Sequence, residues 1–237
     1  MLQIRSAGRL PMRIAVVIPA LDEESAIGGV VGEVPRDLVG EIIVVDNGST
    51  DRTAEVARAA GARVIQEPMR GYGAACLAGA MAARDADILV FLDGDGSDDP
   101  SELPVVLRPI LDGRADLVIG SRIAGRVEEG ALAPHQRFGN RLVTCLLRLL
   151  YGVTLSDLGS FRAVPEDVLR DLGMEHKTYG WPVEMIVKAA KKGYRVAEAP
   201  VSCRKRTGRS KVAGTVRGSL LAGYHLLTTT LRYARRR

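Results

Sequence analysis

Four aspartates lie within the stretch FLDGDGSDDP, residues 91–100. Asp93 and Asp95 flank a single glycine directly after a run of apolar residues. Carboxylates this close repel one another, so water or a cation must offset their charge. Mg²⁺ and Mn²⁺ prefer oxygen ligands and often combine one or two protein carboxylates with phosphate oxygens. The favoured interpretation is therefore a metal, held by Asp93 and Asp95, that in turn holds a diphosphate. A solvated acidic turn is the alternative.

Basic side chains gather in a second stretch, RKRTGRSK at residues 204–211, where five of eight positions are Arg or Lys. Such a loop can close over phosphates beside the acidic turn. The alternatives are a solvated basic loop and a nucleic-acid patch. The stretch is not a P-loop, because the glycine-rich spacing of that motif is absent.

The elements that position these residues alternate between strand and helix. Apolar, β-branched runs predict buried strands, and the segments between them begin with acidic or capping residues and read as helices. The expected strands are 13–20, 41–51, 62–68, 87–96 and 116–122, and the expected helices are 21–34, 49–61, 71–86 and 99–113. This order predicts an α/β fold with a Rossmann-like, doubly wound, mainly parallel sheet.

Ligands of such sheets bind at the carboxyl ends of the strands. The polar residues at the ends of the predicted strands therefore belong on one edge, although they come from separate segments. They are Asp22, Asp46, Asp93, Asp95, Ser121 and Arg122.

The pattern changes after residue 122. Residues 123–136 are predicted to form a loop, and 135–153 and 215–237 to form amphipathic helices. Arg137, Arg141 and Arg148 share one face of the first helix beside an apolar face. Each helix suits either peripheral contact with a membrane surface or packing against the core.

Composition narrows the class of protein. The chain has 237 residues and a net charge of +5, which suits anionic partners. Its three scattered cysteines predict neither a disulfide framework nor a zinc site, and so favour a reducing, cytoplasmic compartment. No signal peptide and no apolar run of about 18 residues is found. Aromatic content of only 4% and an acidic strand edge argue against nucleic acid as a partner.

In this order and spacing, VVIPALDEE, IIVVDNGSTDRT, FLDGDGSDDP and IGSR resemble the nucleotide-sugar domain of family 2 inverting glycosyltransferases over residues 13–122. DLGSFRAV, GWPVEMIVKAAKKGYRVAEAPV and RKRTGRSKV further resemble the dolichyl- and polyprenyl-phosphate mannose or glucose synthases. Residues 1–12 are predicted to form a leader, and the resemblance implies one GT-A domain at 13–237. Residues 13–122 would form its nucleotide-sugar half and 123–237 its acceptor half, with C-terminal amphipathic helices.

The resemblance also implies roles for individual residues. It places the nucleoside among Pro19, Ala20, Asp22 and Glu23, and the base or ribose at Asp46, on a turn shaped by Gly48 and Ser49. It assigns Mg²⁺ or Mn²⁺ to Asp93 and Asp95, and donor or acceptor phosphates to Arg122. The basic loop that closes over the phosphates would contain Arg206, Arg209, Ser210 and Lys211.

The implied activity is transfer of a hexose from a UDP- or GDP-sugar to a polyprenyl or dolichyl phosphate at the inner membrane face. A phosphate acceptor is already anionic and needs little deprotonation, whereas a soluble or lipid hydroxyl acceptor needs a base. Glu184 and Asp157 are the candidate bases, beside Asp95 and Arg122 as catalytic residues. The alternatives are a surface carboxylate at a helix end for Glu184 and a turn cap for Asp157.

The loop after the first strand and the single tryptophan bear on two alternatives. A nucleotidyltransferase would show a glycine-rich, basic loop after its first strand, but the loop here is the acidic PALDEE. Trp181, the only tryptophan, is expected to pack in the core rather than to form a sugar platform. Donor, acceptor and oligomeric state stay open.

Overall fold

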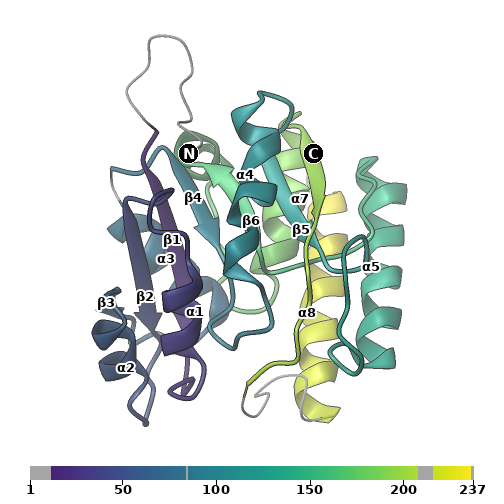
Figure 1. Cartoon of the computed structure of the whole chain (residues 1–237). Helices are drawn as coiled ribbons and strands as arrows, with labels where there is room; N and C mark the ends of the chain where they lie inside the picture. Colours follow the sequence, from purple (N-terminus) through teal and green to yellow (C-terminus); the bar gives the residue numbers. More distant parts are fainter. Residues whose placement is uncertain (1–11, 84, 208–215, 236–237) are drawn as a thin grey trace.

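The computed structural model describes residues 12–83, 85–207 and 216–235. Its centre is a seven-stranded sheet in the order β3-β2-β1-β4-β6-β5-β7 (Figure 1). The strands are β1 Ile14–Ala20, β2 Glu41–Asp46, β3 Arg63–Gln66, β4 Ile88–Phe91, β5 Leu117–Ser121, β6 Arg162–Pro165 and β7 Val196–Pro200.

Four strand pairs are parallel, and only β6 runs the other way, antiparallel to both β4 and β5. The predicted α/β, mainly parallel sheet is therefore confirmed. Because β6 reverses between β4 and β5, those two strands still point the same way. The carboxyl ends of β1, β2, β4, β5 and β7 consequently meet at one edge, as predicted for the polar strand ends.

Helices cover both faces of the sheet (Figure 1). Their bounds are α1 Ile27–Glu33, α2 Thr53–Ala59, α3 Tyr72–Ala82, α4 Leu103–Leu111, α5 Pro134–Tyr151, α6 Glu166–Leu172, α7 Trp181–Lys191 and α8 Val216–Arg235, with a short 3₁₀ turn at Pro100–Glu102. The helix predicted from residue 21 begins only at Ile27, because the preceding residues turn, with a positive φ of 47° at Asp22. The strand predicted to reach residue 96 ends at Phe91, before the aspartates.

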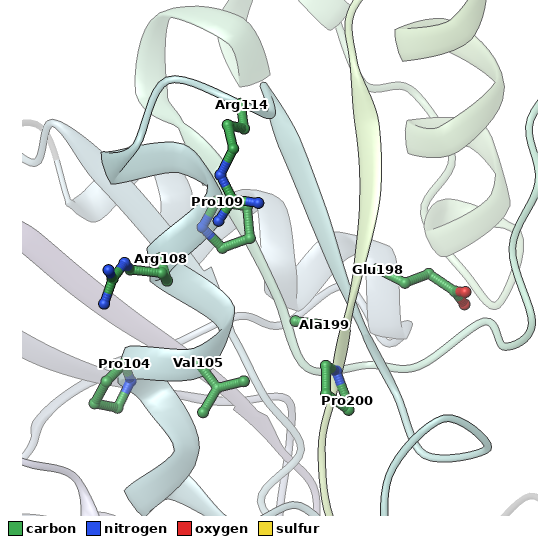
Figure 2. A pocket seen from close by; sticks show the side chains of 8 residues that line it. All are labelled: Pro104, Val105, Arg108, Pro109, Arg114, Glu198, Ala199 and Pro200. Carbon is green, nitrogen blue, oxygen red and sulfur yellow. The ribbon is translucent and has the colours of Figure 1, made fainter.

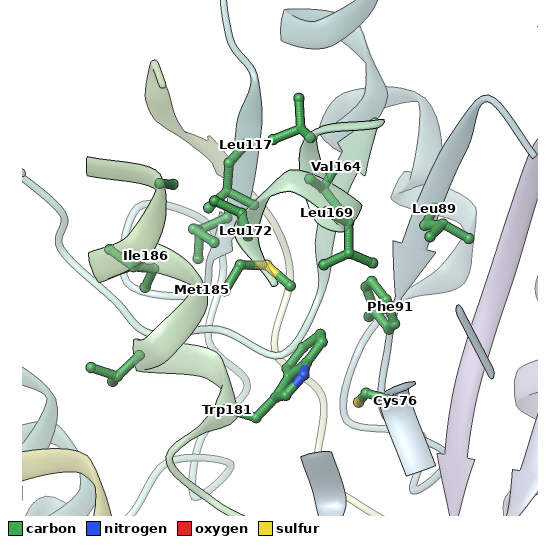
Figure 3. Close-up of a cluster of buried hydrophobic side chains, with 14 of the residues drawn as sticks. Cys76, Leu89, Phe91, Leu117, Val164, Leu169, Leu172, Trp181, Met185 and Ile186 are labelled. Carbon is green, nitrogen blue, oxygen red and sulfur yellow. The ribbon is translucent and has the colours of Figure 1, made fainter. Parts of the chain in front are cut away.

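The core has two layers that follow from the alternation of side chains along a strand. On β1, Ala15 and Val17 face the side covered by α3, α7 and α8, whereas Val16 and Ile18 face the side covered by α1 and α4. In the first layer Trp181 is fully buried against Phe91, with ring centroids 4.9 Å apart (Figure 3). The packing role predicted for Trp181 is confirmed.

The two predicted halves share this sheet, since β6 and β7 come after residue 122. The boundary between the halves stays a prediction, and most of the predicted leader lies outside the described residues. Within the described part of the chain, no helix combines the length and apolar character needed to cross a bilayer. Cys76, Cys145 and Cys203 are free thiols.

Candidate active site

The loops after β1 and β2 are joined by hydrogen bonds at the carboxyl edge of the sheet. Asp22 donates its backbone N–H to the Ser49 hydroxyl at 2.9 Å and accepts from the Thr50 backbone N–H at 2.6 Å. Glu23 donates its N–H to the Thr53 hydroxyl at 2.7 Å. Pro19 and Ala20 end β1 in register with Val45 and Asp46 of β2. The predicted nucleoside residues are thus brought together in one pre-formed turn.

Asp46 is held as an anion inside this turn. Its carboxylate accepts from the Ser49 N–H at 2.9 Å and from the Gln66 amide at 2.8 Å. Burial alone would raise the pKa of Asp46, but the hydrogen bonds from Ser49 and Gln66 outweigh burial and lower it. Gly48 follows with a φ of 87°, a left-handed conformation that suits glycine.

The residues from Asp93 to Asp98, here called the aspartate turn, follow β4. Asp98 is 2% exposed and accepts from the Asp93 backbone N–H at 3.1 Å and the Ser160 hydroxyl at 3.2 Å. Burial raises the pKa of Asp93 and of Asp98, and their neighbouring carboxylates raise both further. The turn therefore holds several carboxylates whose negative charge is only partly compensated.

A second segment, residues 201–207, runs beside this turn and is called the basic strap. Backbone hydrogen bonds join Arg204 to Ser97 at 2.8 Å and Thr207 to Asp95 at 2.8 Å. The Arg206 guanidinium lies 3.3 Å from the Asp95 carboxylate and 3.1 Å from that of Glu23. Arg206 is thus placed beside the predicted metal carboxylates, whereas Arg209, Ser210 and Lys211 lie outside the described residues.

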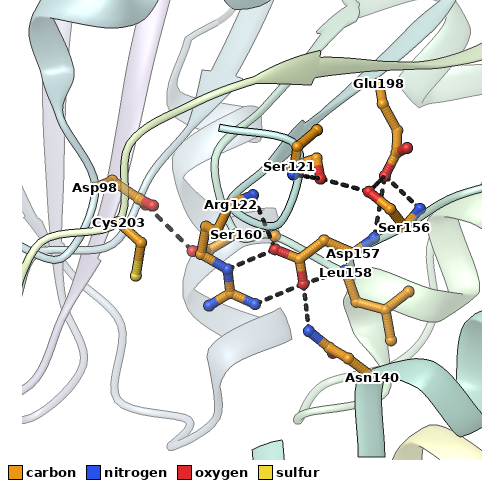
Figure 4. A network of polar contacts seen from close by, with 12 residues as sticks. Asp98, Ser121, Arg122, Asn140, Ser156, Asp157, Leu158, Ser160, Glu198 and Cys203 are labelled. Carbon is orange, nitrogen blue, oxygen red and sulfur yellow. Dashed lines mark hydrogen bonds and ion pairs between the residues drawn. The ribbon is translucent and has the colours of Figure 1, made fainter. Parts of the chain in front are cut away.

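Arg122, directly after β5, is clamped by Asp157 (Figure 4). Its Nε donates to Asp157 at 2.7 Å and its terminal nitrogen donates to the other carboxylate oxygen at 2.9 Å. Asp157 also accepts from the side chain of Asn140 on α5. Burial opposes both charges, but the pairing outweighs it, so the pKa of Asp157 is lowered and that of Arg122 raised.

The charge of Arg122 also reaches the aspartate turn, where it counteracts the rise in the pKa of Asp93 and Asp98. Two predicted site residues from different strands, Arg122 and Asp93, are therefore electrostatically coupled. Asp157 acts on this site through Arg122.

The aspartate turn offers oxygen ligands of the kind that Mg²⁺ and Mn²⁺ prefer. Among the described residues, no group of three or more His, Cys, Asp or Glu side chains is arranged to hold an ion by itself. Asp93 and Asp95 instead fit a cation that completes its shell with phosphate oxygens and water, as Mg²⁺ commonly does. The negative charge of the aspartate turn, which Arg206 and Arg122 offset only in part, favours such a cation.

Comparison with known proteins decides the family. The model of glycosyl transferase family 2 matches residues 15–173, about two thirds of the chain. The chain belongs to glycosyl transferase family 2. A dolichyl-phosphate hexose transferase of Haloferax volcanii is 37% identical over 202 residues, 84% of this chain and 86% of the relative. An undecaprenyl-phosphate mannosyltransferase of Micrococcus luteus is 35% identical over 225 residues, 87% of this chain and 90% of the relative.

Solved structures agree with the family and establish the GT-A fold. Glucosyl-3-phosphoglycerate synthase from Mycobacterium tuberculosis, in complex with Mn²⁺, UDP and phosphoglyceric acid, superposes with a TM-score of 0.77. It is 26% identical, and the match covers 94% of this chain and 79% of that one. The glycosyltransferase family and the GT-A fold are therefore confirmed, and a nucleotidyltransferase is excluded.

Glu184 of the glycosyltransferase lies on α7 and is fully buried. Its carboxylate accepts from the backbone N–H groups of Glu175 and His176 and from the Tyr233 hydroxyl at 2.7 Å. Lys188 lies 2.9 Å away. Burial would raise the pKa of Glu184, but Lys188 and these hydrogen bonds lower it. These contacts join α7 to α8, and none of them involves the aspartate turn.

Two residues near the site, Arg162 and Asp98, were not predicted from the sequence as functional. Arg162 on β6 is fully buried and donates to the backbone carbonyl of Pro182 at 3.0 Å and to that of Gly159. Its charge favours the ionised forms of the nearby Tyr72 and of Asp93. The sequence signal that could have indicated Arg162 was a charged residue inside the otherwise apolar run FRAV. Asp98 was visible within the aspartate cluster but had no assigned role.

A separate hollow of 470 Å³ lies between α4 and β7 (Figure 2). Pro104, Val105, Arg108, Pro109, Arg114, Glu198, Ala199 and Pro200 line it. It contains no predicted site residue, and Arg108 and Arg114 both pair with Asp112. The chemistry is therefore assigned to the strand edge rather than to this hollow.

Proposed function

We propose that this glycosyltransferase moves a hexose from a UDP- or GDP-sugar to a polyprenyl or dolichyl phosphate, with Mg²⁺ or Mn²⁺ as cofactor. The acceptor class rests on one observation. The two candidate bases, Asp157 and Glu184, are both buried, fully partnered and lowered in pKa. A carboxylate in those surroundings is poorly placed to take a proton, and a phosphate acceptor does not require one to be taken.

The relatives support this acceptor, since two of them are named for transfer to dolichyl and undecaprenyl phosphate. The metal and the nucleotide are supported by the solved neighbour, which was crystallised with Mn²⁺ and UDP. That neighbour also contains phosphoglyceric acid, which favours a second candidate function, transfer to the hydroxyl of a small acceptor. In that case Asp157 or Glu184 would have to lose its partners to serve as base.

On the donor side, Asp22 and Asp46 would contact the nucleoside from the turn that they share with Ser49. Asp93 and Asp95 would hold the metal, which when bound offsets the charge of the departing diphosphate. Arg206 would contact the diphosphate in place of Asp95, and the same role is proposed for Arg209 and Lys211, which lie outside the described residues. We assign Arg122 to the acceptor phosphate or the sugar-bound phosphate, in an orientation fixed by Asp157.

The reaction needs no covalent intermediate. An oxygen of the lipid phosphate attacks the anomeric carbon from the face opposite the nucleoside diphosphate. The new carbon–oxygen bond forms as the bond to the diphosphate breaks, so the configuration inverts and the electron pair leaves with the diphosphate. The positive charge of Arg206 would stabilise the negative charge that develops on the leaving diphosphate, and Arg122 would hold the phosphate that it contacts in position.

The test uses purified protein with Mn²⁺ or Mg²⁺ and three donors: UDP-glucose, UDP-N-acetylglucosamine and GDP-mannose. Each is offered with and without a short, water-soluble prenyl phosphate, and with the matching prenyl alcohol as control. We expect one donor to release its nucleotide only with the prenyl phosphate. Equal turnover with the alcohol, or with phosphoglycerate alone, would overturn the lipid-phosphate acceptor in favour of the hydroxyl one.

A further inference from the structure

Helix α5 carries an apolar stripe on its solvent side. Phe138, Leu142, Cys145 and Leu149 follow one another at spacings of four, three and four residues, which places them on one face of the helix. Phe138 is 72% exposed, Leu149 77% and Leu142 41%. The opposite face of the helix packs inward through Val143, Thr144 and Leu147. The helix is therefore apolar on two sides, and only one of them is used by the core.

Basic side chains line one flank of this stripe. Arg137, Arg141 and Arg148 are all exposed, and α5 contains no Asp or Glu. The C-terminal part of the sequence, which includes the neighbouring helix α8, has the same charge, since residues 199–237 contain ten Arg and Lys and no Asp or Glu. Figure 1 shows α5 at the outer edge of the molecule, alongside α8. The most apolar surface of the helix is thus flanked by positive charge only.

We infer that this face of α5 docks on an anionic lipid surface. Exposed apolar side chains beside arginines are the pattern of helices that lie in the membrane interface, where the apolar face enters the acyl boundary and the cations meet lipid phosphates. A second copy of the chain is disfavoured, because a two-fold interface on this face would bring the arginines of one copy near those of the other.

The same helix reaches the site from its inner side. Asn140 donates to Asp157, which clamps Arg122. Docking through Phe138 and Leu149 would therefore set the helix that supports Arg122 against the surface in which a polyprenyl phosphate resides. This consequence for the acceptor rests on the proposed function, whereas the docking itself does not.

The experiment is flotation of the purified full chain with vesicles of phosphatidylcholine, with or without phosphatidylglycerol. We expect binding to the anionic vesicles that weakens with salt, and little binding to the neutral ones. Phe138→Ser with Leu149→Ser should reduce binding to anionic vesicles about tenfold or more. Arg137→Gln with Arg141→Gln should reduce it by a comparable factor on anionic vesicles only. Met81→Ser, which removes an apolar side chain that is 70% exposed on α3, is the matched control and should change nothing.

Equal vesicle binding by wild type and the Phe138→Ser, Leu149→Ser variant would overturn the proposal. So would an absence of binding by wild type, or self-association in sedimentation that this variant abolishes. Transfer to a short, water-soluble prenyl phosphate separates the two hypotheses. If that turnover persists while vesicle binding fails, the docking face is wrong and the proposed function stands. If vesicle binding is as expected but the prenyl phosphate is not turned over, the docking face stands and the proposed function is wrong.

Discussion

Carboxylates that are shielded from water have pKa shifts of opposite direction in two regions of the molecule. In the aspartate turn, Asp93 and Asp98 have raised pKa values, because burial and neighbouring carboxylates disfavour their charge. In the segments after residue 122, Asp157 and Glu184 are fully buried, yet their pKa values are lowered. Asp157 has Arg122 as a partner, and Glu184 has Lys188, Tyr233 and two backbone N–H groups.

This difference separates binding groups from structural ones. A carboxylate whose charge is left uncompensated in the protein alone has affinity to offer to a cation. A carboxylate that already has its full set of donors stabilises the fold and orients its partner. Neutralising a carboxylate of the first kind should therefore lower activity without lowering stability. Neutralising one of the second kind should lower stability.

Asp93→Asn gives the largest expected effect and tests the first half of the comparison. Loss of a metal carboxylate should lower kcat for transfer by about 10³-fold or more, since a bound metal supplies several kcal/mol of charge stabilisation. Because the substitution also relieves repulsion with Asp95, the variant should unfold at an equal or higher denaturant concentration, with a gain of about 1 kcal/mol. Asp95→Asn should behave alike in turnover. A stability loss at Asp93 would break the comparison.

Asp157→Asn tests the second half. The amide cannot pair with both guanidinium nitrogens, and Arg122 is left partly unpaired in a buried place, so we expect a loss of about 3 kcal/mol in unfolding free energy. Acceptor KM should rise. Asp116→Asn is the matched control, because Asp116 also pairs with an arginine, Arg195, at 2.7 Å but in an exposed place. Its loss should be under about 1 kcal/mol.

Glu184→Gln should destabilise the chain by about 2 to 3 kcal/mol, because Lys188 loses its buried partner. Tyr233→Phe, which removes one hydrogen bond to Glu184, should cost about 1 kcal/mol. Since the pKa of Glu184 is lowered in the fold, its stabilisation is present above the ordinary glutamate pKa and is lost as the pH falls through the folded value. Denaturant titrations at a series of pH values should show the unfolding free energies of wild type and Glu184→Gln becoming equal in acid. A full loss of transfer by a stably folded Glu184→Gln at neutral pH would instead restore Glu184 as the base.

The sequence predicts one side of this comparison better than the other. Asp46 and Asp93 were placed correctly because alternating strands and helices bring strand ends to one edge, which is a local pattern. Arg122, the partner of Asp157, is 35 positions away, and Tyr233, one partner of Glu184, is 49 positions away, whereas Lys188 follows Glu184 by only four positions. No local pattern reveals Arg122 or Tyr233 as a partner, and the spacing to Lys188 does not show that Glu184 is buried, so both residues were candidate bases. Arg162 was missed because its place depends on β6, a four-residue strand that inserts antiparallel between β4 and β5.

Arg206→Ala gives the smallest expected effect and sharpens the comparison at the contact between the two parts. With no metal in place, the Arg206 guanidinium partly offsets Asp95 and therefore competes with a cation for it. The variant should bind Mn²⁺ without nucleotide about fivefold more tightly, which corresponds to about 1 kcal/mol. With the nucleotide present the order should reverse, because Arg206 is then a ligand of the diphosphate. Titration by Mn²⁺ electron paramagnetic resonance, with and without UDP or GDP, measures both.

Arg204→Ala is the control for that titration, because Arg204 pairs with Glu33 and Asp99 rather than with Asp95. It removes the same charge from the same basic strap but leaves the metal carboxylates alone. If both variants tightened Mn²⁺ binding equally, the effect would come from the net charge of the strap. If only Arg206→Ala did so, the effect would come from Arg206 itself. This arginine would then pair with Asp95 in the free protein and release the Asp95 carboxylate when the metal binds.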